Sequence, residues 1–62
     1  MSEYNKKTMT VKEFASLMGI GYNKAYELVH IKGFPMFKCG RKIFIISSKI
    51  DAWFENNIGK EL

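Results

Sequence analysis

Residues 10–29 have the sequence TVKEFASLMGIGYNKAYELV, and they decide the fold. Thr10 and Glu13 have the spacing of a capping box, in which each side chain accepts a hydrogen bond from the other residue's backbone N–H. Apolar residues then recur at the spacing of one helical face, at Val11, Phe14, Ala15 and Met18, with Leu17 beside them. Gly19 follows, and glycine commonly ends a helix in the left-handed conformation. We therefore expect a first helix that starts at Thr10 and is ended by Gly19.

A second helix is predicted from about Tyr22 to Ile31, after a tight turn at Gly19-Ile20-Gly21. Its inward face holds Ala25, Leu28 and Val29, with Ile20 packed underneath. At about 100° per residue, the opposite face presents Asn23, Glu27 and His30, flanked by Tyr26, Lys24 and Ile31. Gly33 ends this helix, and Pro35 prevents its continuation because proline has no backbone N–H.

A β-hairpin is predicted next, because the run Ile43-Phe44-Ile45-Ile46 is β-branched and aromatic. Its first strand is Met36-Phe37-Lys38, its turn lies around Cys39-Gly40, and its second strand runs from Lys42 to Ile46. A last helix follows. Ser47-Ser48 is its predicted N-cap, Asp51 lies in its first turn, and its predicted buried residues are Ile50, Trp53, Phe54 and Ile58. Asn57 and Gly59 fray its end.

The composition predicts a single small domain without catalytic machinery. The chain has 62 residues, of which 47% are hydrophobic; we expect a flexible arm over residues 1–7 and one domain over residues 8–62. A single cysteine, Cys39, excludes an intramolecular disulfide and a multi-cysteine zinc site. Without a nucleophile–base pair, a metal cluster or a phosphate loop, we expect no enzyme activity, no catalytic residues, no metal and no cofactor. No apolar run approaches the roughly 20 residues of a membrane span, and no signal peptide is recognisable, so we expect a cytoplasmic protein and no membrane partner.

Positive charge is concentrated in the middle of the chain. The net charge is +4 and the isoelectric point about 9.4. Residues 21–49 hold six cationic residues against Glu27 alone, a net +5, whereas residues 50–62 hold one against three acidic residues, a net −2. A basic balance of this kind favours a polyanionic partner, nucleic acid in particular.

Two helices around a glycine-containing turn, followed by a hairpin with a cationic tip, predict a winged helix-turn-helix, mainly α with a two-stranded wing and a C-terminal helix. In such a fold the second helix enters the major groove. The predicted DNA-binding residues of this helix are Tyr22, Asn23, Lys24, Tyr26 and Glu27, and those of the wing are Lys38, Arg41 and Lys42. Asparagine can pair with adenine, glutamate can accept a hydrogen bond from cytosine, and lysine can reach guanine. The wing cations are expected to contact the DNA backbone.

Each of these residues also has a purely structural interpretation. Tyr22, Asn23 and Lys24 are ordinary polar residues for a helix start, and the cationic hairpin tip is also what a solvated turn looks like. His30 either contacts a phosphate or is a solvated histidine near the negative end of the helix dipole. Trp53 is interpreted as a core anchor rather than a platform for base stacking. Ile31 and Phe34 are either buried against the wing or available to a protein partner.

The sequence resembles a known family. Residues 10–20, TVKEFASLMGI, look like the first helix and turn of the small excisionase-type DNA-binding domains, which share the winged-helix fold of the mercury-resistance regulators and the AlpA-type regulators. The resemblance continues at YELV (26–29), KGFP (32–35), KCGRK (38–42) and IDAWF (50–54), and covers about residues 8–56. The family usually has serine followed by a basic or polar residue where this chain has Gly21-Tyr22. The base preference therefore does not carry over.

The resemblance implies a protein that binds double-stranded DNA on a mobile element such as a phage, transposon or genomic island. Excisionases of this kind are recombination directionality factors rather than catalysts: they bind and bend DNA so that a tyrosine or serine integrase assembles in the excising geometry. The other implied partners are neighbouring copies on DNA, and the location is the bacterial cytoplasm, at the nucleoid when bound. With no obvious dimerisation helix, we expect a monomer in solution.

Two other functions stay open at the level of sequence. A small AlpA-like transcriptional regulator of phage or genomic-island genes needs the same domain, and an adjacent integrase gene distinguishes the two. A protein-interaction module that binds an acidic partner through its basic face is the third hypothesis. That module would keep its partner at about 0.3 M salt, where exposed charges are strongly screened, and would not shift DNA in a gel.

Overall fold

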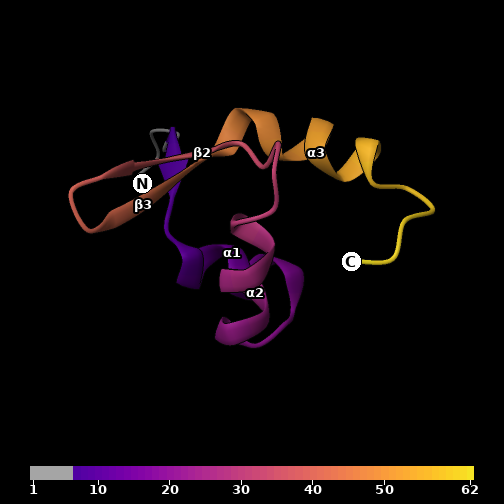
Figure 1. Ribbon diagram of the computed structural model, residues 1–62, viewed down its shortest axis with the longest axis horizontal. Helices are drawn as coiled ribbons and strands as arrows, with labels where there is room; N and C mark the ends of the chain where they lie inside the picture. Colours follow the sequence, from indigo (N-terminus) through magenta and orange to yellow (C-terminus); the bar gives the residue numbers. More distant parts are fainter. Residues whose placement is uncertain (1–6) are drawn as a thin grey trace, which may run out of the picture.

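The computed structural model describes residues 7–62 of the chain and shows three helices and a small antiparallel sheet (Figure 1). In chain order the elements are β1 (Thr8–Met9), α1 (Val11–Met18), α2 (Tyr22–Val29), β2 (Met36–Cys39), β3 (Lys42–Ile46), the short 3₁₀ helix η1 (Ser47–Lys49) and α3 (Ile50–Asn56). This architecture confirms the predicted winged helix-turn-helix. The predicted arm over residues 1–7 lies outside the described residues, apart from Lys7.

Helix α1 begins and ends as its sequence predicts. The Thr10 hydroxyl accepts a hydrogen bond from the Glu13 N–H at 3.0 Å, and Glu13 Oε1 accepts one from the Thr10 N–H at 2.9 Å. At the other end Gly19 adopts φ 71°, ψ 32°, a left-handed conformation that costs glycine little. Val11, Phe14 and Ala15 are buried. The capping box therefore sets where the helix starts, and the apolar stripe sets which face packs inward.

Helix α2 is two residues shorter than predicted. The chain leaves α-helical bonding after Val29, because the N–H groups of His30 and Ile31 bond to carbonyls only three residues back. This tightening is typical of a helix end. The predicted inward residues Ala25, Leu28 and Val29 are all buried. Gly21 is the N-cap residue and offers no side-chain cap, and its carbonyl accepts a hydrogen bond from the Ala25 N–H at 3.1 Å.

The sheet has the strand order β1-β3-β2, with all pairs antiparallel. In the wing, Cys39 pairs with Lys42, so the turn consists of Gly40 and Arg41 and lies one residue later than predicted. Gly40 has φ 65° at the first turn position, the conformation for which glycine is favoured in tight hairpins. Strand β1 was not predicted: Thr8 and Met9 pair with Ile46 and Ile45. Two residues are too few to show a strand pattern in sequence.

The start and end of α3 correct two predictions. Ser47 and Ser48 form the 3₁₀ turn η1 rather than an N-cap, and α3 has no side-chain cap. The Ser47 N–H donates a hydrogen bond to the carbonyl of Lys7 at 3.0 Å, which joins the start of η1 to the residue just before β1. Ile58 was predicted to be buried but is 79% exposed, because α3 ends at Asn56 and the Asn57 side chain donates to the Trp53 carbonyl. The helical stripe therefore stops before Ile58.

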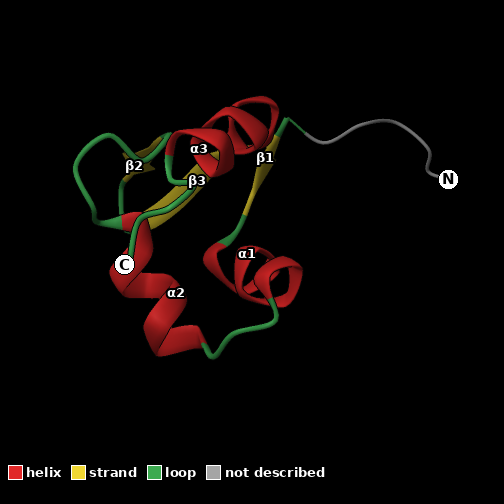
Figure 2. Ribbon diagram, turned by 90° about the vertical axis from the view of Figure 1, so that its right-hand side faces the viewer, coloured by secondary structure: helices red, strands yellow, loops and turns green. Residues whose placement is uncertain are grey.

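The core lies between the helices and the inner face of the sheet (Figure 2). Phe14 is fully buried at the centre of this core. Its ring packs edge to face against the rings of Phe34 and Trp53, with centroid distances of 5.2 and 6.1 Å. These contacts confirm Trp53 as a core anchor and place Phe34 in the core rather than against the wing. Met18, Ile20 and Phe54 are partly buried around this cluster. Within residues 7–62, no helix has the length and hydrophobicity to cross a membrane.

Candidate nucleic-acid interface

A hollow of about 440 Å³ separates α2 from the wing and is bordered by the first turn of α1. Its charged and aromatic lining residues are Lys12, Tyr22, Tyr26, Lys38, Arg41 and Lys42. Three segments that are distant in sequence therefore meet at one concave surface. Among residues 7–62, no acidic side chain lines it. A surface of this charge attracts phosphates, and its tyrosine rings and hydroxyls offer contacts to bases and backbone.

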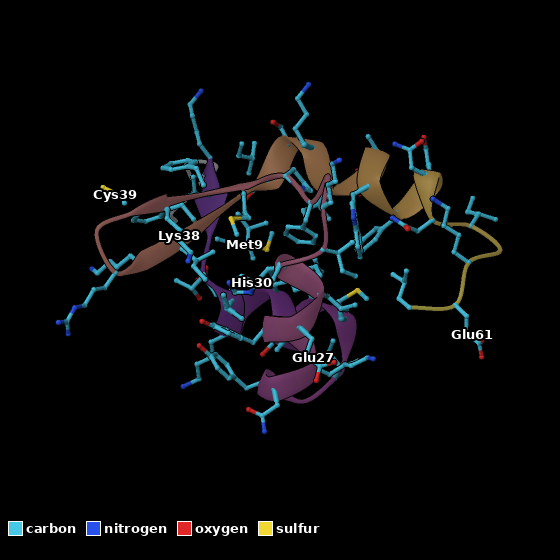
Figure 3. All side chains as sticks on the ribbon, in the orientation of Figure 1. Met9, Glu27, His30, Lys38, Cys39 and Glu61 are labelled. Carbon is cyan, nitrogen blue, oxygen red and sulfur yellow. The ribbon has the colours of Figure 1, made fainter. Side chains whose placement is uncertain are left out.

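The wing extends its cations beyond the body of the domain. Strand alternation places Lys38 on the face that also carries Met36 and Ile43, which are packed against the core, whereas Cys39 and its cross-strand partner Lys42 lie on the opposite face. Figure 3 shows Lys38 on the side of the helices and Cys39 on the outer side of the hairpin. Arg41 lies in the turn itself. The tight two-residue turn fixes these cations at the end of a paired ladder rather than on a long loop.

One flank of α2 carries a column of rings that faces the wing. Tyr22 and Tyr26 stack at 6.1 Å with an interplanar angle of 27°, and Tyr26 meets the His30 ring at 4.5 Å. The His30 Nδ1 lies 2.8 Å from the Tyr26 carbonyl, and because a carbonyl only accepts, Nδ1 carries the hydrogen and donates. Tyr22 and Tyr26 remain 53% and 45% exposed. The column is therefore ordered by internal contacts yet available to a ligand.

The other flank of α2 is occupied within the protein. Lys24 Nζ lies 3.7 Å from Glu27 Oε1 and donates a hydrogen bond to the Leu62 main-chain oxygen at 3.3 Å. The structure thus divides the five residues predicted on α2. Tyr22 and Tyr26 join the wing around the hollow, Asn23 is exposed, and Lys24 and Glu27 pair with each other outside it.

Lys12 is the residue of the hollow that the sequence interpretation missed. It stands inside the capping box, between Thr10 and Glu13, where the pattern assigned it no role. Its position in the first turn of α1 is exposed, away from the buried stripe. An exposed cation in the helix that precedes a recognition helix was the available signal, but only the fold shows that it borders the same hollow as the wing.

Comparison with protein-family models supports this interpretation of the geometry. The model described as a helix-turn-helix domain matches residues 8–58, from the first strand to just beyond α3. Comparisons with curated proteins and with solved structures gave no match. The matched range includes both helices of the motif, the wing and the last helix, and thus nearly the whole chain. This chain belongs to the helix-turn-helix domain family and is a small DNA-binding domain of the excisionase/AlpA type.

Proposed function

We propose that this protein binds double-stranded DNA sites on a mobile element and acts as an excisionase, a recombination directionality factor for a separate integrase. The observation that carries the DNA part is the hollow between α2 and the wing, with tyrosines on one wall and cations on the other. The excision part rests on the resemblance to excisionase-type domains. DNA-binding families of this kind suggest a protein without catalytic activity of its own.

In the proposed complex the start of α2 enters the major groove. Tyr22, Asn23 and Tyr26 then meet base edges, because the first residues of a recognition helix reach furthest into the groove. Lys38, Arg41 and Lys42 hold the adjacent backbone and supply affinity that is independent of sequence. Lys12, in the first turn of α1, contacts the same stretch of DNA backbone as the wing. The α2 residues thus contact bases, whereas the wing cations and Lys12 contact the backbone, and mutations can test the two roles separately.

Excision requires that the bound DNA follow a curved path. Cations of the wing neutralise phosphates on one side of the duplex, and neighbouring copies extend that effect along the site; smooth bending costs on the order of a few kcal/mol. A tyrosine or serine integrase then assembles on the bent DNA. The protein is a monomer before it binds, and such a role places it in the bacterial cytoplasm, at the nucleoid when bound.

Recombination assays with the cognate integrase test this function directly. Integration and excision are measured on plasmid substrates with and without the protein. We expect the protein to stimulate excision and to inhibit integration or leave it unchanged. If it binds DNA at the element but changes neither reaction, the excisionase role is wrong and the AlpA-like regulator remains, to be tested by reporter transcription from the bound promoter.

A gel-shift titration over salt concentration tests DNA binding itself. We expect affinity to fall steeply as salt rises, since each phosphate contact contributes about 0.9 to the logarithmic slope. If no duplex is shifted even at low salt, while an acidic protein partner still binds at about 0.3 M salt, where exposed charges are strongly screened, the DNA interface is wrong. The basic face then serves a protein partner.

A further inference from the structure

The segment after α3 turns back toward the recognition helix. Helix α3 ends at Asn56, and the chain reverses through Gly59, which adopts φ 84°, while the Lys60 N–H bonds to the Asn57 carbonyl at 3.0 Å. Figure 1 shows the C-terminal trace leaving α3 and returning toward α2 on the side away from the wing. We call residues 57–62 the return segment. Its reversal depends on a backbone conformation that favours glycine.

The last residue of the return segment, Leu62, contacts Lys24, which is the only cationic residue of α2. Lys24 Nζ donates to the Leu62 main-chain oxygen at 3.3 Å, across 38 positions of sequence, and also lies 3.7 Å from Glu27 Oε1. The ammonium group therefore has two oxygen acceptors from its own protein. Half of the Lys24 side chain remains exposed, so these contacts are weak enough to be exchanged. A DNA phosphate that approaches this flank must compete with both.

We propose that the return segment masks Lys24 and thereby lowers the sequence-independent affinity of the DNA-binding surface. The inference rests on the proposed DNA-binding function and adds to it a determinant outside the recognition helix and the wing. Phosphates are present at every site on DNA, whereas base contacts depend on sequence. A lysine that is withheld from phosphates lowers affinity for all duplexes without touching the base contacts of Tyr22 and Asn23.

A truncation that leaves the side-chain charge unchanged tests the mask. A variant ending at Ile58 lacks residues 59–62 and so loses one cation, Lys60, and one anion, Glu61. For a scrambled duplex we expect its affinity to rise about two- to fivefold, the range set by weak surface ion pairs. The salt slope should steepen by about 0.9, one extra phosphate contact. Fluorescence anisotropy over a salt series measures both quantities.

A second background separates masking from a general effect of the tail. The same truncation is made in Lys24→Ala, where no ammonium is left to release. We expect the truncation to change neither affinity nor slope in that background. A full-length variant, Gly59→Val, provides a check without deletion: the site has room for a Cβ, but φ 84° is unfavourable for valine, so the reversal should open. It should behave like the truncation.

Three results would overturn the mask. The first is an unchanged scrambled-duplex affinity in both the truncated and the Gly59→Val protein, with thermal melting showing that both are folded. The second is an equal gain in the presence and absence of Lys24. The third is a weaker binding to DNA after truncation, which would make the return segment a contact rather than a mask. If the intact protein binds no duplex at all, the proposed function fails instead, which is a different outcome.

Discussion

The two flanks of α2 differ both in their residues and in the part of the protein that faces them. On one flank Tyr22 and Tyr26 look across a hollow toward the cationic wing. On the other, Lys24 is held by Glu27 and by the Leu62 main-chain oxygen. All four side chains belong to the same eight-residue helix and are exposed to solvent. Exposure on α2 therefore does not by itself leave a side chain free of contacts: one flank borders the hollow beside the wing, and the return segment contacts the other.

Neutralising the wing should have the largest effect, because it removes the wall opposite the tyrosines. A triple variant with Lys38→Ala, Arg41→Ala and Lys42→Ala should weaken binding to all duplexes and lower the salt slope by roughly 2 to 3 units, about 0.9 per lost phosphate contact. The single variant Arg41→Ala should lower it by about one. Anisotropy at several salt concentrations measures these slopes. An unchanged slope in the triple variant would show that the wing does not contact DNA.

Removing the tyrosine wall should alter specificity more than total affinity. In Tyr26→Ala we expect the ratio between a duplex selected from a random library and a scrambled duplex to fall about tenfold, within the 1–3 kcal/mol typical of a base contact. Tyr26→Phe is the matched control. If the ring contacts a base, this variant keeps the ratio, whereas a hydroxyl bound to phosphate makes it weaker on both duplexes. A ratio unaffected by Tyr26→Ala contradicts the assignment of this flank to base contacts.

Asn23 and Lys24 are neighbours in sequence and provide the sharpest test of the difference between flanks. Asn23→Ala should reduce discrimination several-fold at one base pair, since a two-pronged contact to adenine contributes about 1–3 kcal/mol. Lys24→Ala should change affinity about twofold or less in the intact protein, because surface ion pairs are weak and its ammonium is already engaged. The comparison is made on the selected duplex and its single-base variants. A larger loss from Lys24→Ala than from Asn23→Ala would show that Lys24, despite its contacts within the protein, is the more important of the two for DNA binding.

The smallest effect is expected at Cys39, which lies on the outer face of the wing, paired with Lys42. Its thiol is exposed, and the residue is the last one of β2. Cys39→Ser should leave DNA affinity and salt slope unchanged, because serine is nearly isosteric and the side chain lies opposite Lys38 on the strand. The same anisotropy series measures it, with Arg41→Ala as the positive comparison. A large loss in Cys39→Ser would show that the Cys39 side chain itself contacts the DNA.

The sequence was sufficient where a structure depends on neighbouring residues. The Thr10–Glu13 capping box, the left-handed Gly19 and the inward face of α2 all arise from residues a few positions apart, and each was predicted. The wing was predicted for the same reason, because a short apolar strand and a glycine turn are local signals. The errors there were small: the turn moved by one residue, and α2 lost its last two.

The prediction failed where distant residues decide the outcome. Strand β1 exists because Thr8 and Met9 find partners in β3, and neither residue shows a strand pattern. The engagement of Lys24 depends on Leu62, 38 positions away. Lys12 borders the hollow because the fold brings the first turn of α1 close to the wing, and the sequence does not show this proximity. The candidate DNA-binding residues were therefore named from sequence, but their division into two flanks required the fold.

The pairing of β1 with β3 has a consequence for the order of folding. Met9 pairs with Ile45, 36 positions later, so this pairing must close a large loop, at an entropic cost that local contacts do not face. Helices α1 and α2 contact each other within residues 11–29, and we expect their packing to form first during folding, since local contacts form fastest. Until β3 has been synthesised, the apolar face around Phe14 has no sheet to cover it. A nascent chain on the ribosome therefore completes this core only after β3 and α3 have been synthesised.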